Sequence, residues 1–215
     1  MTAAESVNNG PEDADGPDGL RDYGSTTLTE LDLDITGVER LILPETLTHL
    51  TVRGFSSGSA YVSVEDLVEG LSGLGAVGIP VTEVSAADAG RDLSVRVVGG
   101  MPALDGLENV RTLRVEGITT LDLDDVVDSF PALTTLELSG DPGHLVEVPS
   151  LAELTALEHL TLRGFPDLDA RTLPDPAFLP VLGTLTLAGI PDGTVAELRA
   201  RYPRVRIVTG EEDAR

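Results

Sequence analysis

A nine-residue pattern of alternating aliphatic side chains recurs along this chain of 215 residues. The segment Leu47–Phe55 reads LTHLTVRGF, and Leu157–Phe165 reads LEHLTLRGF, which is nearly the same sequence. The same frame returns in three further segments, Val110–Ile118, Leu133–Gly140 and Leu182–Ile190. Such repetition constrains the fold more than composition does, because one short unit cannot bury its apolar face alone and must stack on its neighbours.

The copies follow one another at a nearly constant spacing. Their central leucines fall at positions 113, 136, 160 and 185, in steps of 23, 24 and 25 residues. A partial copy opens the array at Leu28–Leu33, and shorter copies lie at Val95–Val97 and Val205–Ile207. Because alternate side chains of a strand point to opposite faces, Leu160 and Leu162 are predicted to be buried. The pattern predicts short parallel strands that stack into a sheet with a core behind it.

The frame L-x-x-L-x-L at this spacing resembles the leucine-rich repeat, whose units are about 20–29 residues long. The resemblance covers roughly residues 26–209, and Leu43–Val52 is similar to the short Leu-Pro repeats of bacterial members, so the chain resembles a divergent bacterial type. It implies an α/β fold: a leucine-rich-repeat solenoid with a curved parallel β-sheet on the concave face and helices or loops on the convex face.

The corner after each strand departs from the usual family pattern, in which asparagine or cysteine follows the strand. Here that position mostly follows a glycine and reads Phe55, Ile118, Asp141, Phe165 and Ile190. The three asparagines of the chain are at 8, 9 and 109, so an asparagine ladder cannot form. We expect apolar packing beside a permissive glycine instead.

The segments between strands have helical patterns in three places. Apolar side chains recur at helical spacing over residues 63–71, 122–130 and 194–202, and Ser63 and Thr194 are placed to cap two of these helices. The acids at 122–125 suit a helix N-terminus, where negative charge is favoured. The proline-rich stretch between Gly164 and Leu182 predicts an extended return.

The domain boundaries are predicted from where this apolar periodicity begins and ends. Residues 1–24 are acidic and lack apolar periodicity, which predicts a disordered tail, and residues 211–215 predict a short disordered end. Residues 25–210 form the predicted repeat domain. Its first part is irregular, because leucines at 31, 41 and 50 lie too close for full repeats and one repeat between Phe55 and Val95 is stretched.

The charge restricts the classes of partner. The formal net charge is −23, and all 14 basic residues are arginine. A pI near 4.2 argues against nucleic acid and against an anionic membrane, since both are bound through clustered Lys and Arg. It permits a basic protein partner. A generic solubility surface, or a host that disfavours lysine, accounts for the acidity equally well, and the oligomeric state stays open.

Several classes of site find no support in the sequence. Cysteine is absent, which removes disulfides and thiolate metal sites. The G-x-G-x-x-G motif at residues 73–78 follows a helix-like stretch rather than a strand, which favours a loop over a dinucleotide site, and residues 13–18 lack the EF-hand spacing. The three histidines, at 49, 144 and 159, converge with no acid or serine, so we expect no cofactor, no metal and no catalysis. No signal peptide or long apolar run is present, which predicts a cytoplasmic protein.

The exposed face of the predicted sheet is the remaining candidate for a site. Its outward positions supply the candidate binding residues His49, Thr51, Arg53, Arg96, Thr112, Arg114, Glu116, Thr135, Glu137, His159, Thr161, Arg163, Thr184, Thr186 and Arg206, next to Glu30, Asp32, Asp34 and Ser94. Five of the 14 arginines lie here, which we interpret as an arginine spine for binding, because Arg is enriched at interfaces. The alternative is that Thr and Arg simply suit exposed strand positions beside acids.

These patterns favour a non-catalytic module that binds a protein partner through the concave sheet face. One alternative is an acidic inhibitor or immunity-type protein that neutralises a basic enzyme such as a nuclease, which is an analogy at the level of the fold. A second and weaker alternative is an enzyme.

Overall fold

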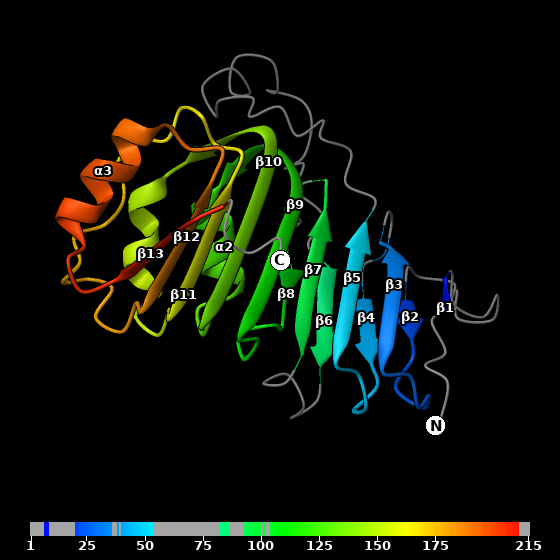
Figure 1. The fold of residues 1–215 in the computed structure, drawn as a ribbon. Coiled ribbons are helices and arrows are strands. Elements are labelled where there is room, and N and C mark those ends of the chain that lie inside the picture. The colour runs from blue at the N-terminus through cyan, green and yellow to red at the C-terminus, as the bar shows by residue number, and fades with distance from the viewer. Residues whose placement is uncertain are drawn as a thin grey trace, which may run out of the picture.

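The structure is a computed structural model that describes residues 7–8, 20–35, 38, 40–53, 82–86, 93–99, 101 and 104–210. It is an α/β protein whose strands pair in parallel in two sheets, with few helices in the part described (Figure 1). The predicted helix over 63–71 and the loop at 73–78 lie outside the described residues.

The larger sheet has nine strands within the described ranges, in the order β1-β3-β5-β7-β9-β10-β11-β12-β13. These strands are β1 (Val7–Asn8), β3 (Glu30–Asp34), β5 (His49–Arg53), β7 (Ser94–Val98), β9 (Thr112–Asp122), β10 (Thr135–Val146), β11 (His159–Arg163), β12 (Thr184–Ala188) and β13 (Arg206–Thr209). Their pairing aligns the sequence copies in register: Leu136 lies opposite Leu160, and Leu160 lies opposite Leu185. Each copy therefore adds one strand beside the previous one.

The smaller sheet pairs four strands of the described chain in parallel, in the order β2-β4-β6-β8. They are β2 (Leu20–Asp22), β4 (Arg40–Leu43), β6 (Thr82–Ala86) and β8 (Leu104–Asp105). Leu41 belongs to this sheet, whereas Leu31 and Leu50 are direct neighbours in the larger one. These three leucines are closely spaced because the chain alternates between the two sheets, adding a strand first to one and then to the other. The sequence did not predict this alternation.

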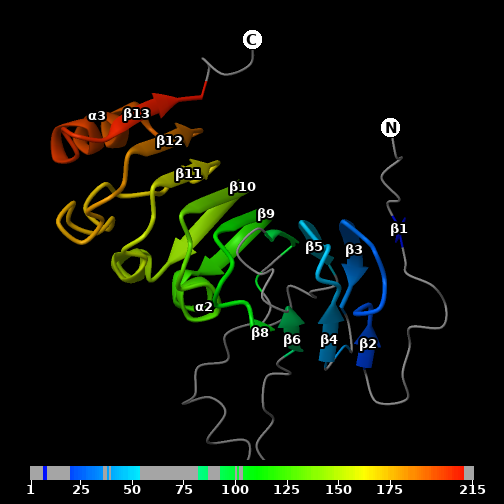
Figure 2. The ribbon, with the colours of Figure 1, turned by 90° about the horizontal axis from the view of Figure 1, so that it is seen from below.

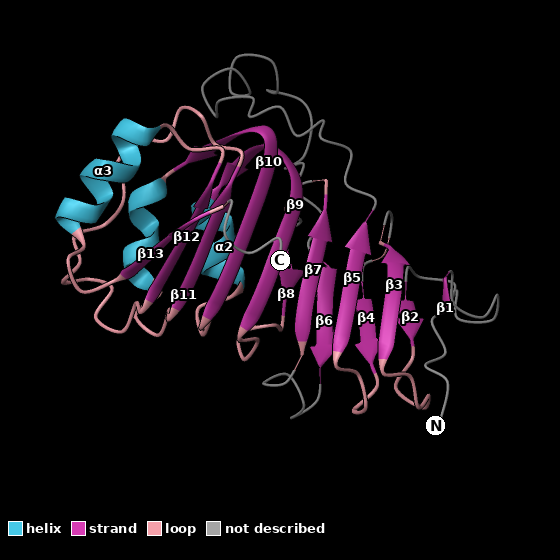
Figure 3. Ribbon diagram, in the orientation of Figure 1, coloured by secondary structure: helices cyan, strands magenta, loops and turns pink. Residues whose placement is uncertain are grey.

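The helices lie behind the C-terminal half of the larger sheet (Figure 3). They are α2 (Leu123–Ser129), the 3-10 helix η3 (Val148–Glu153) and α3 (Asp192–Arg201). In Figure 2 the larger sheet follows an arc, with α2, α3 and the smaller sheet on its outer side. None of the described helices and no described strand covers the other face of the larger sheet, along the inner side of the arc. Among the described residues, no helix is both long and apolar enough to cross a membrane.

Two of the three predicted helices can be checked. The helix over 122–130 is confirmed: α2 starts after Asp122, whose carboxylate accepts a hydrogen bond from the backbone N–H of Asp124 at 3.0 Å. The cap at Thr194 is wrong, because α3 begins at Asp192 with Pro191 in the N-cap position. The Thr194 hydroxyl instead donates to the Leu168 carbonyl at 3.2 Å, which ties α3 to the preceding return. That proline-rich return has no helix, which agrees with the prediction, but it is a series of turns rather than an extended segment.

One aliphatic core runs behind the larger sheet through all its repeats. Leu136, Leu160 and Leu185 are each at most 1% exposed and form one continuous row across the strands. Tyr23 and Tyr202 are both 1% exposed and lie toward opposite ends of the chain. The inward assignment of the alternating leucines is therefore confirmed.

The expected boundary at residue 24 is wrong for the last residues of the tail. Leu20–Asp22 form β2 and pair with β4, and the neighbouring Tyr23 is buried in the core. The strand is short and acids and glycines flank it, so the sequence shows no alternation of apolar residues there. Val7–Asn8 also pair with β3. The other residues of the tail, and residues 211–215, lie outside the described residues.

The corners after the strands are built from glycine and apolar side chains, as the sequence predicted. Gly117 and Gly164 have φ values of 69° and 74°, in the left-handed region that favours glycine. The residues that follow them, Ile118 and Phe165, are each 1% exposed. The corners also bond to one another, since the N–H of Gly164 donates to the Ala188 carbonyl at 2.8 Å. Backbone contacts between neighbouring repeats thus occupy the place of an asparagine ladder.

Candidate binding face

The strand register collects the outward side chains into three rows across the larger sheet, which together we call the candidate face. The first row is Glu30, His49, Ser94, Thr112, Thr135, His159, Thr184 and Arg206; the second is Asp32, Thr51, Arg96, Arg114, Glu137, Thr161, Thr186 and Val208; the third holds Asp34, Arg53, Val98, Glu116, Ser139, Arg163 and Ala188. All the candidate binding residues lie on this one face. Sequence reasoning left out Val98, Ser139, Ala188 and Val208, which the same alternation places there.

Three of the five arginines on the face bind carboxylates of the face itself, on a neighbouring strand or on the same one. An Nη of Arg53 lies 2.5 Å from a carboxylate oxygen of Asp32. Arg96 pairs with Glu116, and Nε of Arg114 lies 2.6 Å from the same carboxylate and 3.8 Å from that of Glu137. The expected arginine spine is therefore an alternation of cations and anions over β3 to β10. In that region the arginines already have partners within the protein.

The charges at the centre of this alternation reinforce one another. The hydrogen bond from Arg96 has the largest effect and lowers the pKa of Glu116. Burial opposes it, and the nearby charge of Arg114 lowers the pKa further. The same hydrogen bond raises the pKa of Arg96. Both groups therefore stay ionised at neutral pH, and the cluster is a fixed feature of the face.

Glu116→Gln is expected to lower the free energy of unfolding at about pH 7 by no more than about 1 kcal/mol, because the pairs are partly exposed and screened by solvent. The pKa of Glu116 is lower in the folded chain than its ordinary value of 4.5, so its stabilising effect is complete above that value. The effect is lost as the pH falls through the folded pKa. Urea unfolding of both proteins from pH 7 into acid measures this difference. A gap between them that widens in acid would contradict the assignment.

The C-terminal end of the face differs in charge from the rest. The outward positions of β11, β12 and β13 include Arg163 and Arg206 and carry no carboxylate. Neither arginine has an ion pair with any residue in the described part of the chain. The closest acid contact at this end is Glu158, whose carboxylate lies 4.0 Å from Nε2 of His159 beside the start of β11.

The face as a whole is balanced in charge, although the chain carries a net charge of −23. It holds five arginines, Arg53, Arg96, Arg114, Arg163 and Arg206, and five carboxylates, Glu30, Asp32, Asp34, Glu116 and Glu137. The carboxylates lie on β3, β9 and β10. Among the described residues the acidic excess therefore lies away from the face, and within the face charge changes from acidic at β3 to basic at β11–β13.

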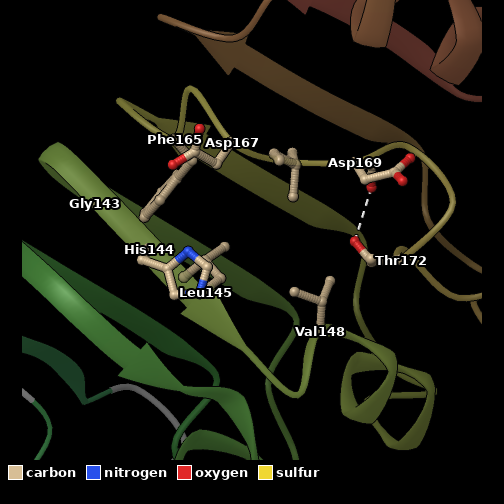
Figure 4. A pocket seen from close by; sticks show the side chains of 9 residues that line it. Gly143, His144, Leu145, Val148, Phe165, Asp167, Asp169 and Thr172 are labelled. Atoms are coloured by element: carbon tan, nitrogen blue, oxygen red, sulfur yellow. Dashed lines mark hydrogen bonds between the residues drawn. The ribbon is translucent and has the colours of Figure 1, made fainter.

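An open hollow lies off the face, between the end of β10 and the return that follows β11 (Figure 4). It encloses about 410 Å³ of space continuous with solvent, and its lining includes His144, Phe165 and Asp169. The Asp169 carboxylate accepts a hydrogen bond from the N–H of Arg171 at 2.9 Å, and its carbonyl accepts one from the Thr172 hydroxyl at 2.8 Å. Asp169 therefore serves to hold its own turn. No group of three or more metal-ligating side chains gathers within the described ranges.

The comparisons with known proteins add no family to this geometry. The chain matches no family model, no curated protein and no solved structure.

Proposed function

We propose that the chain is a non-catalytic binding module of leucine-rich-repeat type, a solenoid that holds a protein partner on the candidate face. The observation that carries the proposal is the concentration of exposed arginine and half-buried threonine, balanced in charge, on one face of a continuous sheet. The parallel register and the repeat spacing support the solenoid, since each repeat adds a strand of the same sequence frame.

The form of the face suits a protein surface better than a small molecule. It extends over eight strands from β3 to β13, and with strands about 4.8 Å apart it spans roughly 34 Å. Small ligands are usually enclosed in concave, mostly apolar pockets, whereas this face is broad and polar. Its residues are supported from behind by a buried core, so they are held in place before any partner arrives.

Arg163→Glu is expected to weaken partner binding at least tenfold while leaving the thermal unfolding midpoint nearly unchanged, because its side chain is exposed and makes no ion pair with the described residues. Arg199→Glu on α3 is the matched control, since it makes the same charge change on the other side of the sheet. Its expected effect on binding is less than twofold. Isothermal titration against a partner captured with the immobilised chain measures both values.

The choice of variants follows from the ion pairs. Arg53→Glu would place a carboxylate against Asp32. Glu197→Arg would break the pair between Glu197 and Nε of Arg171, which are 3.4 Å apart. Both substitutions would therefore disturb the free protein as well as any complex. Arg163 and Arg199 avoid that difficulty. Equal loss of affinity in the two variants would show that only net charge is sensed, and a larger loss for Arg199→Glu would move the site to the helical side.

A second candidate, an acidic inhibitor or immunity-type protein for a basic enzyme, is favoured by one observation: Glu30 and Asp34 are exposed at the acidic end of the face. In that case Glu30→Arg together with Asp34→Arg would abolish binding, and Arg163→Glu would strengthen it. The same titration therefore separates the two candidates.

A further inference from the structure

We propose that the C-terminal end of the candidate face takes an acidic peptide segment of the partner, with two of its carboxylates bound by Arg163 and Arg206. We call this end the donor patch and define it as His159, Thr161, Arg163, Thr184, Thr186 and Arg206. This inference rests on the proposed function and names the chemistry of the partner at one end of the face.

The two arginines of the candidate face whose guanidinium groups have no partner in the described structure both lie in the donor patch. Arg163 and Arg206 are exposed, and neither guanidinium group forms a hydrogen bond or an ion pair with a described residue. The hydroxyl groups of Thr161, Thr184 and Thr186 are likewise unbonded within the described part of the chain, and all three are half-buried. Guanidinium groups donate and never accept, so the ligand that satisfies them must supply acceptors. Carboxylates are the strongest acceptors that an ordinary peptide offers.

The rest of the face provides the contrast that makes this location specific. Arg53, Arg96 and Arg114 already bind carboxylates of the chain itself. An acidic segment that lay over β3–β10 would have to compete with those pairs and would meet repulsion from the same carboxylates. Over β11–β13 it meets no outward acid of the described residues. Two acids border the patch: Glu158, and Glu137, which lies opposite Thr161 and faces Arg114 at 3.8 Å. Charge complementarity therefore selects an acidic segment at this end and disfavours a basic one.

The positions of the two arginines set the spacing of the carboxylates. Arg163 lies opposite Ala188 on β12, and Arg206 lies opposite Thr184 on the same strand, so the pair is separated by two strand steps and four residues along the strand. With about 4.8 Å between strands and about 3.3 Å per residue, their Cα atoms are about 16 Å apart. An extended peptide covers that distance in about five residues. Acidic residues four to six positions apart fit both arginines.

The net charge of −23 does not prevent this binding at physiological salt. Charges farther apart than about 8 Å in solvent are largely screened at that ionic strength. The two arginines of the patch are within that range of a bound carboxylate, whereas most of the described acids are not on the face. Local charge therefore decides the interaction, and lower salt strengthens both the attraction and the distant repulsion.

The test uses the full chain and two fluorescein-labelled ten-residue peptides, one of alternating Ser and Glu and one of alternating Ser and Lys. Fluorescence anisotropy at physiological salt should show saturable binding of the Ser/Glu peptide. Its Kd should rise at least tenfold when Arg163→Glu and Arg206→Glu are combined, and by an intermediate factor when both are replaced by Gln. Arg199→Glu on α3 is the control for Arg163→Glu alone, with an expected change in Kd below twofold, and thermal unfolding verifies that all variants are folded.

Three outcomes would overturn the inference. The Ser/Glu peptide could fail to bind the full chain. It could also lose as much affinity for the Arg199→Glu variant as for the Arg163→Glu variant. It could also bind only after Glu211, Glu212 and Asp213 are replaced by Ser, which would make the acidic end of this chain, rather than a partner, the occupant. If the Ser/Glu peptide fails while a captured partner still loses affinity on substitution of Thr51 or Thr112 by Arg, the proposed function stands and this inference alone falls.

Discussion

Gly164→Ala is expected to lower the free energy of unfolding by about 2–5 kcal/mol, one of the two largest effects we predict for a single substitution. Gly164 has a φ of 74°, where an alanine pays about 1–2 kcal/mol for the left-handed conformation. In addition, a Cβ at this position would overlap the carbonyl oxygen of Gly140 in the neighbouring repeat. That oxygen is backbone and cannot rotate away, so adjacent repeats must separate, at a cost typical of overpacking, about 1–3 kcal/mol.

Two other glycines separate the contributions to this loss. Gly99 has a φ of 99° but no atom within 4 Å of an added Cβ, so Gly99→Ala reports the conformational cost alone. Gly193 lies in α3 in open space, and Gly193→Ala is expected to stabilise by about 0.5–1 kcal/mol, because alanine is the better helix residue. Urea unfolding gives all three values. A loss for Gly164→Ala no larger than for Gly99→Ala would show that the repeats are not in close contact at this corner.

Leu160→Ala is expected to cost about 2–5 kcal/mol, the range for a buried leucine that leaves a cavity. Leu160 is 1% exposed and lies in β11 between Leu136 and Leu185 of the adjacent strands, so both neighbouring repeats lose contacts. The core has little means of refilling the space, since interiors are packed as densely as crystals. Urea unfolding at equilibrium measures the change.

Thr161→Ala is the control for that substitution, because Thr161 is the next residue of β11 and points to the opposite face. Its expected effect is within about 0.5 kcal/mol, as for most surface positions. A loss below about 0.5 kcal/mol for Leu160→Ala, or a large one for Thr161→Ala, would mean that the two faces of the sheet are exchanged.

The repeated strands could be predicted from the sequence because each is specified by its own side chains. Alternation of Leu with Thr or Arg fixes both the extended backbone and the buried face, and nearly identical copies fix which strands are neighbours. Leu160 and Thr161 are placed correctly for that reason. The glycine corners followed in the same way, because the absence of asparagine left glycine and apolar packing as the alternative.

The smaller sheet and the true start of the folded part were missed because their signals are short. Leu20–Asp22 and Leu104–Asp105 are strands of three and two residues, too short for an alternation to stand out. They are held by pairing with other strands, which is a property of the assembled structure rather than of the segment. The start of α3 was misplaced because Thr194 was taken as its cap. The Thr194 hydroxyl instead donates to the Leu168 carbonyl, which is again a contact of the assembled structure rather than of the segment.

The membership of the candidate face was predictable, but its electrostatics were not. Alternation alone puts Arg96, Arg114 and Glu116 on the same face. Which arginine meets which carboxylate depends on strand register, and the sequence fixes that only where copies are clear. Glu116 lies opposite Val98 and Ser139, and from there its carboxylate reaches two arginines. The division of the face into a paired region and the donor patch is therefore a result of the structure.

The most direct test of the binding face is the rate at which phenylglyoxal modifies individual arginines, measured by mass spectrometry with and without a captured partner. Arg163 and Arg206 lie on the face, and Arg199 lies off it on α3, all three within the C-terminal part of the chain. If the partner covers the candidate face, modification of Arg163 and Arg206 slows at least tenfold in the complex while Arg199 reacts as before. Slowing at Arg199, with Arg163 and Arg206 unchanged, would contradict a binding site on the sheet.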